Sequence, residues 1–96
     1  MIGERISPIL EVLTMQTIFL DGRCYSSPEA VYDALARMLA LPAYFGRNAD
    51  ALNDCLSEFR TPVSLWIASR GEGDVARCIS VISNVFEDNG CDVKEL

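Results

Sequence analysis

Two aspartates in the middle of the chain, Asp50 and Asp54, have the spacing of neighbours on one helical face. Like charges four residues apart on a helix lie side by side and repel each other by about 0.2–0.5 kcal/mol. Such a pair could take part in acid/base chemistry, bind a divalent metal ion, or present negative charge to a partner. The chain already has 14 acidic residues against 8 basic ones, so the added repulsion needs an explanation.

Metal binding and acid/base catalysis by this pair would each need a further feature that the rest of the sequence does not provide. A metal ion would need further oxygen ligands, and no other segment is marked as their source. Acid/base catalysis would need an apolar pocket that raises the pKa of one carboxyl, and a convex helix face offers none. We therefore expect no metal site, no catalytic residue and no cofactor. The remaining interpretations are a protein interface or ordinary solvated acids, with Asp50 also favoured by the helix dipole.

The composition indicates one acidic, folded domain and excludes several functions. The chain has 96 residues, of which 50% are hydrophobic, which is enough for a core without metal or disulfide support. Its net charge of −6 argues against binding to nucleic-acid backbones. It has no histidine, so Ser-His and Cys-His catalysis within this chain is excluded. We do not expect an enzyme.

Cysteine usage and the first residues indicate a cytoplasmic location. The widely spaced cysteines are Cys24, Cys55, Cys78 and Cys91, and their spacing favours neither a zinc site nor a redox motif. We interpret them as reduced and mostly buried, with one disulfide pairing as the open alternative. Residues 1–15 contain no continuous apolar stretch, so they predict neither a secretion signal nor a membrane span. They form an N-terminal extension without an assigned role.

Periodicity and turn signals predict the elements that would position the aspartates. Strands are expected over 16–20, 63–68 and 91–96, and helices over 27–41, from Asn48 to about Phe59, and from Asp74 to Asn89-Gly90. Because helices separate the strands, the sheet should be parallel. The predicted class is α/β, with a small three-stranded parallel sheet and three main helices packed on it, over residues 16–96.

The second helix divides into an apolar and a polar side. The apolar side comprises Ala51, Leu52, Cys55, Leu56 and Phe59. The polar side comprises Asp50, Asn53, Asp54 and Ser57, which recur at i, i+3, i+4 and i+7. We expect the sheet to bury the apolar side and the acidic stripe to face outward. In the preceding loop, Tyr44 and Phe45 could join an interface, although core packing is favoured for Phe45.

This stretch resembles the barstar family, the intracellular inhibitors of secreted bacterial ribonucleases. The resemblance rests on the long mixed pattern P-x-Y-F-G-x-N-x-D-A-L-x-D-C-L over residues 42–56. Leu41 before it also matches, and residues 17–22 and 90–93 fit the family's first strand and its last helix-to-strand junction. The likeness covers about residues 16–96 and leaves residues 1–15 outside.

The resemblance implies that the loop and the second helix block a bacterial ribonuclease active site in a one-to-one complex. It places Asp54 at the centre with Asp50 beside it, where carboxylates stand in for RNA phosphate. The further ribonuclease-binding positions that it matches are Tyr44, Asn48, Ala49, Asn53 and Ser57. It implies an antitoxin or immunity role without nucleic-acid or membrane binding. The alternative is an interaction or regulatory domain of the same fold whose partner is not a ribonuclease.

Three positions depart from the family pattern. Asn53 stands where the family often has an aromatic residue, and Arg47 stands where relatives can have an acid. Val85 falls where one well-known relative has another acidic contact. These departures bear on which ribonuclease is bound more than on the inhibitor class.

Overall fold

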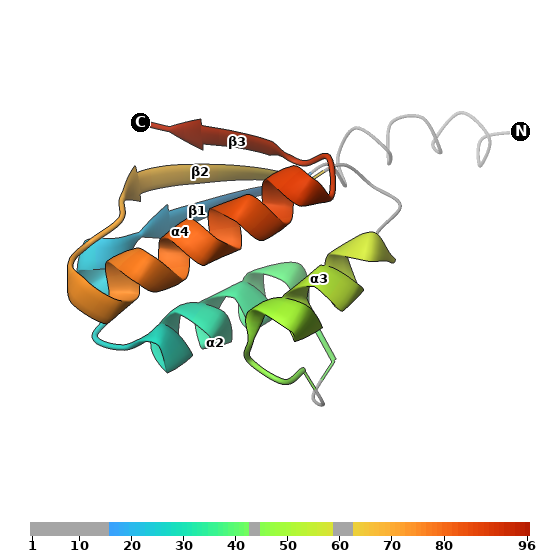
Figure 1. The fold of residues 1–96 in the computed structure, drawn as a ribbon, viewed down its shortest axis with the longest axis horizontal. Coiled ribbons are helices and arrows are strands. Elements are labelled where there is room, and N and C mark those ends of the chain that lie inside the picture. The colour runs from blue at the N-terminus through green and yellow to red at the C-terminus, as the bar shows by residue number, and fades with distance from the viewer. Residues whose placement is uncertain (1–15, 43–44, 59–62) are drawn as a thin grey trace, which may run out of the picture.

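The structure is a computed structural model that describes residues 16–42, 45–58 and 63–96. Its elements are β1 (Gln16–Asp21), the 3₁₀ turn η1 (Gly22–Cys24), α2 (Pro28–Leu39), α3 (Ala49–Ser57), β2 (Val63–Ser69), α4 (Gly73–Asp88) and β3 (Asp92–Glu95). The three strands form one sheet in the order β1-β2-β3, and both pairings are parallel. The helices lie on one side of this sheet (Figure 1). The predicted α/β class is confirmed.

The sheet buries one face and exposes the other, as the period-2 pattern of its strands requires. Along the central strand β2, Leu65 and Ile67 are buried. Trp66 points to the opposite face and is 37% exposed. In register with it are Phe19 on β1 and Lys94 on β3, whose ammonium nitrogen lies 5.4 Å from the Trp66 ring centroid. The helices therefore pack on the side of Leu65 and Ile67.

Capping residues set the helix boundaries within a few residues of those predicted. The Ser27 hydroxyl accepts a hydrogen bond from the Ala30 backbone N–H at 3.3 Å, and α2 begins directly after it. This helix ends at Leu39 rather than at residue 41, because Ala40 has a left-handed backbone with φ 54°. At the other end of the fold, α4 starts one residue earlier than expected, with Glu72 as its N-cap.

The core lies between the sheet and the pair α2 and α4. Side chains from all layers meet in it without exposure, among them Leu20 on β1, Leu35 on α2, and Ile79 and Phe86 on α4. Leu35, Ile79 and Phe86 belong to the apolar sides of α2 and α4 that helical spacing predicts, whose members recur at intervals of three and four residues. In α4 the predicted apolar side is buried except for Val85, which is half-buried.

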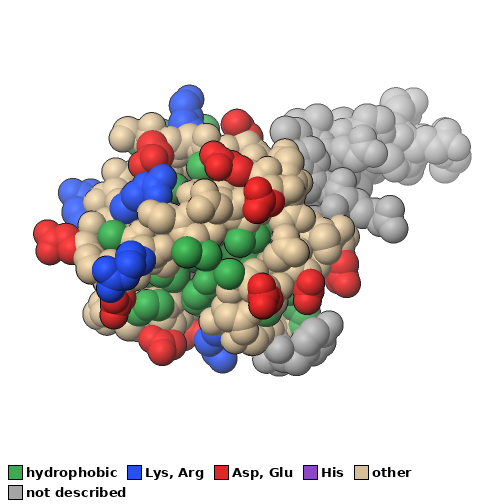
Figure 2. Space-filling view, in the orientation of Figure 1, with side chains coloured by type: hydrophobic (Ala, Val, Ile, Leu, Met, Phe, Trp, Pro, Cys, Tyr) green, Lys and Arg blue, Asp and Glu red, His purple; other side chains and the backbone are tan. Residues whose placement is uncertain are grey.

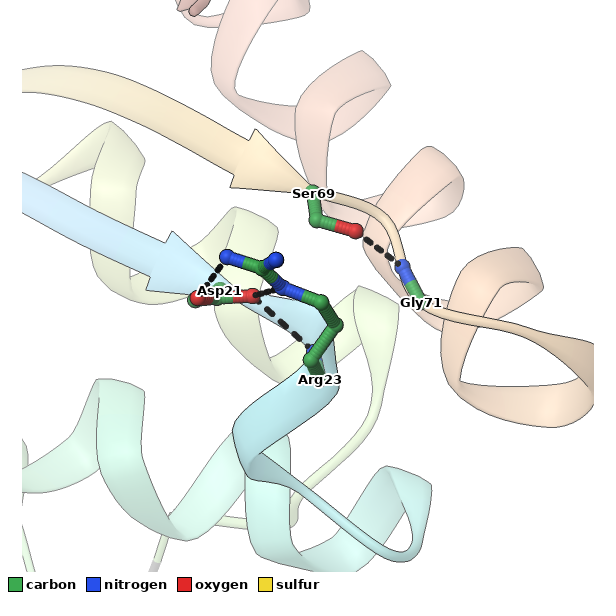
Figure 3. Close-up of polar contacts among 4 residues, drawn as sticks. All are labelled: Asp21, Arg23, Ser69 and Gly71. Atoms are coloured by element: carbon green, nitrogen blue, oxygen red, sulfur yellow. Dashed lines mark hydrogen bonds and ion pairs between the residues drawn. The ribbon is translucent and has the colours of Figure 1, made fainter.

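Two turns interlock where β1 and β2 end (Figure 3). The Asp21 carboxylate accepts hydrogen bonds from the backbone N–H of Arg23 at 3.1 Å and from its side-chain nitrogens at 2.9 and 2.8 Å. In the neighbouring turn, the Ser69 hydroxyl accepts from the Gly71 N–H at 3.1 Å. Gly22 is buried between these turns, so the predicted Asp-Gly turn also serves as a packing contact.

The expected environment of the cysteines is only partly correct. All four are free, and only Cys78 is buried. Cys24 is exposed, so the expectation of mostly buried cysteines is wrong for it, because η1 turns its side chain away from the core. Among the helices of residues 16–42, 45–58 and 63–96, none is long and apolar enough to cross a bilayer. Residues 1–15 lie outside the described part of the chain.

Candidate functional site

The Asn48 side chain fixes the start of α3 and ties it to the preceding loop. Asn48 has the extended backbone of an N-cap residue, and its Oδ1 accepts from the Ala51 N–H at 2.8 Å. Its Nδ2 donates to the Gly46 carbonyl at 3.1 Å. One amide thus satisfies a free N–H of the first turn and holds the loop against the helix. The predicted cap is confirmed.

The polar side of α3 faces outward, as the sequence predicts. Asp50, Asn53, Asp54 and Ser57 are all exposed. Within the described residues, the carboxylates of Asp50 and Asp54 form no ion pair and accept no hydrogen bond. We call these four side chains the acidic face of α3. Their exposure is established here, whereas their role in binding stays a prediction.

The electrostatic field over this face is negative. In Figure 2, acidic side chains gather over α3 and over the C-terminal end of α4. The last turn of α3 contains no basic residue. The pKa of the half-buried Cys55 thiol is raised, first by burial and then by the negative charges of Glu58 and Asp54. In the described part of the chain, no group of three or more acidic or cysteine side chains is placed to hold a metal ion.

A hydrogen bond between two asparagines fastens this face to α4. Asn53 Oδ1 accepts from Asn89 Nδ2 at 2.7 Å, although the two residues are 36 positions apart. The same Asn89 nitrogen also donates to the Val85 carbonyl at 2.9 Å. Asn53 therefore positions α3 besides being a predicted contact residue. No local signal in the sequence could identify its partner.

The apolar side of α3 has a different neighbour from the one expected. Leu52 and Leu56 are buried, as predicted. However, the principal neighbour of α3 is α4 rather than the sheet. The prediction that the sheet covers this side is therefore wrong, because α2 and α4 already occupy the sheet. Figure 1 shows α3 beside α4.

Of the two aromatic residues in the loop before α3, the structure describes Phe45. Phe45 is 6% exposed and packs against Tyr32, with ring centroids 6.1 Å apart. Core packing is thus the correct interpretation for Phe45. Tyr44 lies outside the described residues. Of the remaining predicted contacts, Ala49 is half-buried, and the Ser57 hydroxyl donates to the Asp54 carbonyl at 2.8 Å.

Comparison with known proteins agrees with this fold. A small parallel α/β domain with an acidic, outward-facing helix after an aromatic loop is the architecture that the resemblance implies. The family model described as "Barstar (barnase inhibitor)" matches residues 15–78. The chain belongs to this family. The match includes β1, α2, α3 and β2, and so contains the whole acidic face.

A relative supports the same assignment over a shorter stretch. The Bacillus subtilis (strain 168) protein named "Putative ribonuclease inhibitor YrdF" is 46% identical over 43 residues. This alignment covers 45% of the present chain and 47% of the relative. The chain therefore spans about half the length of the curated relative that it matches.

Proposed function

We propose that this protein inhibits a bacterial ribonuclease by placing the acidic face of α3 in the enzyme's active site. The observation that carries the proposal is the exposure of Asp50 and Asp54 on one face, with no cation paired to either among the described residues. Because the chain belongs to the barstar family, a ribonuclease is the expected partner of this face. The name of the Bacillus subtilis relative is consistent with it.

The mechanism rests on the replacement of phosphate by carboxylate. A ribonuclease active site uses arginine and lysine side chains to hold the phosphate groups of RNA. The Asp54 carboxylate takes the place of one phosphate and accepts charge-assisted hydrogen bonds, which a guanidinium can donate in pairs. Asp50 adds a second negative charge one turn away. The repulsion between the two acids in the free protein is relieved when cations of the enzyme lie against both.

The fold holds this face ready for binding. The Asn48 amide fixes the first turn of α3, and the bond between Asn53 and Asn89 fixes its middle to α4. A surface that is already ordered loses less conformational entropy on association. Around the two aspartates, the further contacts proposed are Tyr44, Asn48, Ala49, Asn53 and Ser57.

The same proposal includes the partner's stoichiometry and the place of action. One acidic face fits one active site, so we propose a one-to-one complex. The net charge of −6 favours fast encounter with a basic enzyme. Four free cysteines are typical of a reducing compartment, so we place the protein in the cytoplasm. There it would protect the cell as an antitoxin or immunity protein.

Inhibition of a panel of secreted bacterial ribonucleases, with barnase included, tests this function. RNA cleavage and the dissociation constant are measured for the wild type, Asp54→Ala and Asp50→Ala. For the ribonuclease bound most tightly, removal of the central carboxylate should weaken binding by about 2–5 kcal/mol, because a desolvated cation is left unpaired. The loss for Asp50→Ala should be smaller.

Asp92→Ala is the matched control, since it removes one exposed carboxylate on β3 instead of α3. Its affinity should stay near that of the wild type after allowance for net charge. Equal affinity of Asp54→Ala and the wild type would refute the phosphate-replacement mechanism. If no ribonuclease is inhibited, the alternative of an interaction domain with another kind of partner replaces the proposal.

A further inference from the structure

A cavity of about 310 Å³ lies where α2 ends and the chain turns toward α3. Its apolar lining includes Leu41 and Phe45. Two arginines also line it, Arg37 from the last turn of α2 and Arg47 from the loop. The cavity is therefore apolar in part and is lined by two basic residues.

The charge around this cavity is opposite to that of α3. Arg47 donates through Nε to Asp33 and forms an ion pair with it. Within the described residues, neither terminal nitrogen of Arg47 has a hydrogen-bond partner, and Arg37 has no ion pair. Two arginines thus line the cavity, and within the described residues only Arg47 is paired with a carboxylate, that of Asp33. The result is a local positive charge on a chain whose net charge is −6.

Folding stability does not explain the arginine at position 47. Its backbone has φ 55°, a left-handed conformation that glycine or asparagine adopts with less strain. The side chain of Arg47 is 55% exposed and that of Asp33 is 41% exposed. Ion pairs with this exposure contribute little to stability. Arg47 therefore has an unfavourable backbone conformation, and its charge contributes little to folding stability.

We propose that the cavity receives an acidic side chain from the rim of the ribonuclease active site and holds it between Arg37 and Arg47. This inference rests on the proposed function, because Arg47 directly precedes Asn48, the N-cap of α3, so the cavity adjoins the start of the proposed interface. A guanidinium can bind a carboxylate through two parallel hydrogen bonds, and the methylene groups of the acid pack against Leu41 and Phe45.

This arrangement selects among ribonucleases. The acidic face attracts any basic active site, whereas the cavity accepts only an enzyme with a carboxylate at the corresponding point of its rim. An enzyme with a basic residue there meets two arginines, and this repulsion disfavours the complex. The arginine that departs from the family pattern thus acts as a specificity-determining residue.

Charge reversal tests the inference on the ribonuclease whose binding requires Asp54. Arg37→Glu and Arg47→Glu should each raise its dissociation constant by about tenfold or more, since a like charge then opposes the carboxylate. Arg77→Glu is the matched control, because Arg77 is likewise exposed and ion-paired to an acid, Asp74, but lies on α4. After correction for net charge, this control should bind like the wild type.

Two further variants separate binding from folding. Arg47→Gly removes the side chain and relaxes the backbone, so it should bind more weakly while its unfolding midpoint is equal or higher. Replacement of the ribonuclease's own rim acid by lysine should restore binding to Arg47→Glu. If Asp54→Ala weakens binding but both charge reversals at the cavity do not, the inference is wrong and the proposed function stands. If no ribonuclease is bound, both fail.

Discussion

The backbone at Gly22 lies so close to the next turn that no side chain fits there. A Cβ atom at this position would overlap the carbonyl group of Arg70 and would lie 2.6 Å from the Gly71 nitrogen. Because all of these are backbone atoms, they can give way only if the ends of β1 and β2 move apart. We expect Gly22→Ala to lower the free energy of unfolding by about 1–3 kcal/mol, measured by urea denaturation.

Gly90→Ala is the control for this prediction. Gly90 has φ 77°, but a Cβ atom there would meet nothing within 4 Å. Its substitution therefore introduces backbone strain alone, of about 1–2 kcal/mol. A loss at Gly22 smaller than the loss at Gly90 would show that the two turns separate easily, and would contradict the close packing described here.

At the scale of one element, the start of α3 depends on the Asn48 side chain. Without it, the Ala51 N–H has no partner in the first turn. We expect Asn48→Ala to lower the free energy of unfolding by about 0.5–2 kcal/mol, while Asn48→Asp and Asn48→Ser should restore most of the loss. Urea denaturation measures this effect. Full stability of Asn48→Ala would mean that the cap does not hold α3.

Stability and inhibition should be measured together for these variants. Asn48 is also a proposed contact of the ribonuclease, so weaker inhibition by Asn48→Ala can have two causes. The Asn48→Ser variant separates them, because serine caps the helix but lacks the amide that reaches Gly46. Restored stability with weakened inhibition would assign the amide a direct or loop-positioning part in binding.

The elements could be predicted from the sequence because their ends carry strong local signals. Ser27-Pro28 and Asn48 start helices, and Asn89-Gly90 ends one, as expected. Periodicity also identifies which side of each helix is buried. It does not identify the neighbour that buries it, so the sequence predicts the sheet for α3 where the structure has α4.

The candidate site could be predicted in its composition but not in its internal connections. The i, i+3, i+4, i+7 spacing is enough to place Asp50 and Asp54 together on an exposed face. The bond from Asn53 to Asn89 and the ion pair from Arg47 to Asp33 join residues far apart in sequence. Such pairs depend on how the helices are arranged, and a single sequence contains no record of that arrangement.

At the scale of the whole molecule, the proposed binding surface and the exposed face of the sheet belong to different layers of the fold. The helical layer carries the acidic face, on α3, and the cavity with Arg37 and Arg47, at the end of α2 and in the following loop. The sheet layer has Phe19 and Trp66 on its open face. Because the proposed partner uses only the helical layer, substitutions on the open face should affect solubility or stability before they affect inhibition.

Stability of the whole domain should depend on pH through Tyr32, which lies where α2, the loop and α4 meet. Burial raises the pKa of its phenol to about 12, with a further contribution from the nearby Cys78. In the unfolded chain the phenol titrates near its usual value of about 10. The folded state therefore keeps the proton longer, and its stabilising effect is complete below pH of about 10 and is lost as the pH rises toward 12.

Tyr32→Phe removes this contribution, because phenylalanine has the same ring but no proton to lose. The free energy of unfolding of the wild type should fall between pH of about 10 and 12 more steeply than that of the variant. Cys78 remains in both proteins, and burial raises the pKa of its thiol, so both should lose stability at lower pH as well. This loss should be larger in the variant, which lacks the Tyr32 hydrogen bond that lowers the Cys78 pKa. Parallel curves for the two proteins above pH of about 10 would mean that the Tyr32 phenol titrates alike in the folded and unfolded chain. The ring would then not be enclosed at the junction of α2, the loop and α4, and the packing that positions the loop before the acidic face would have to be revised.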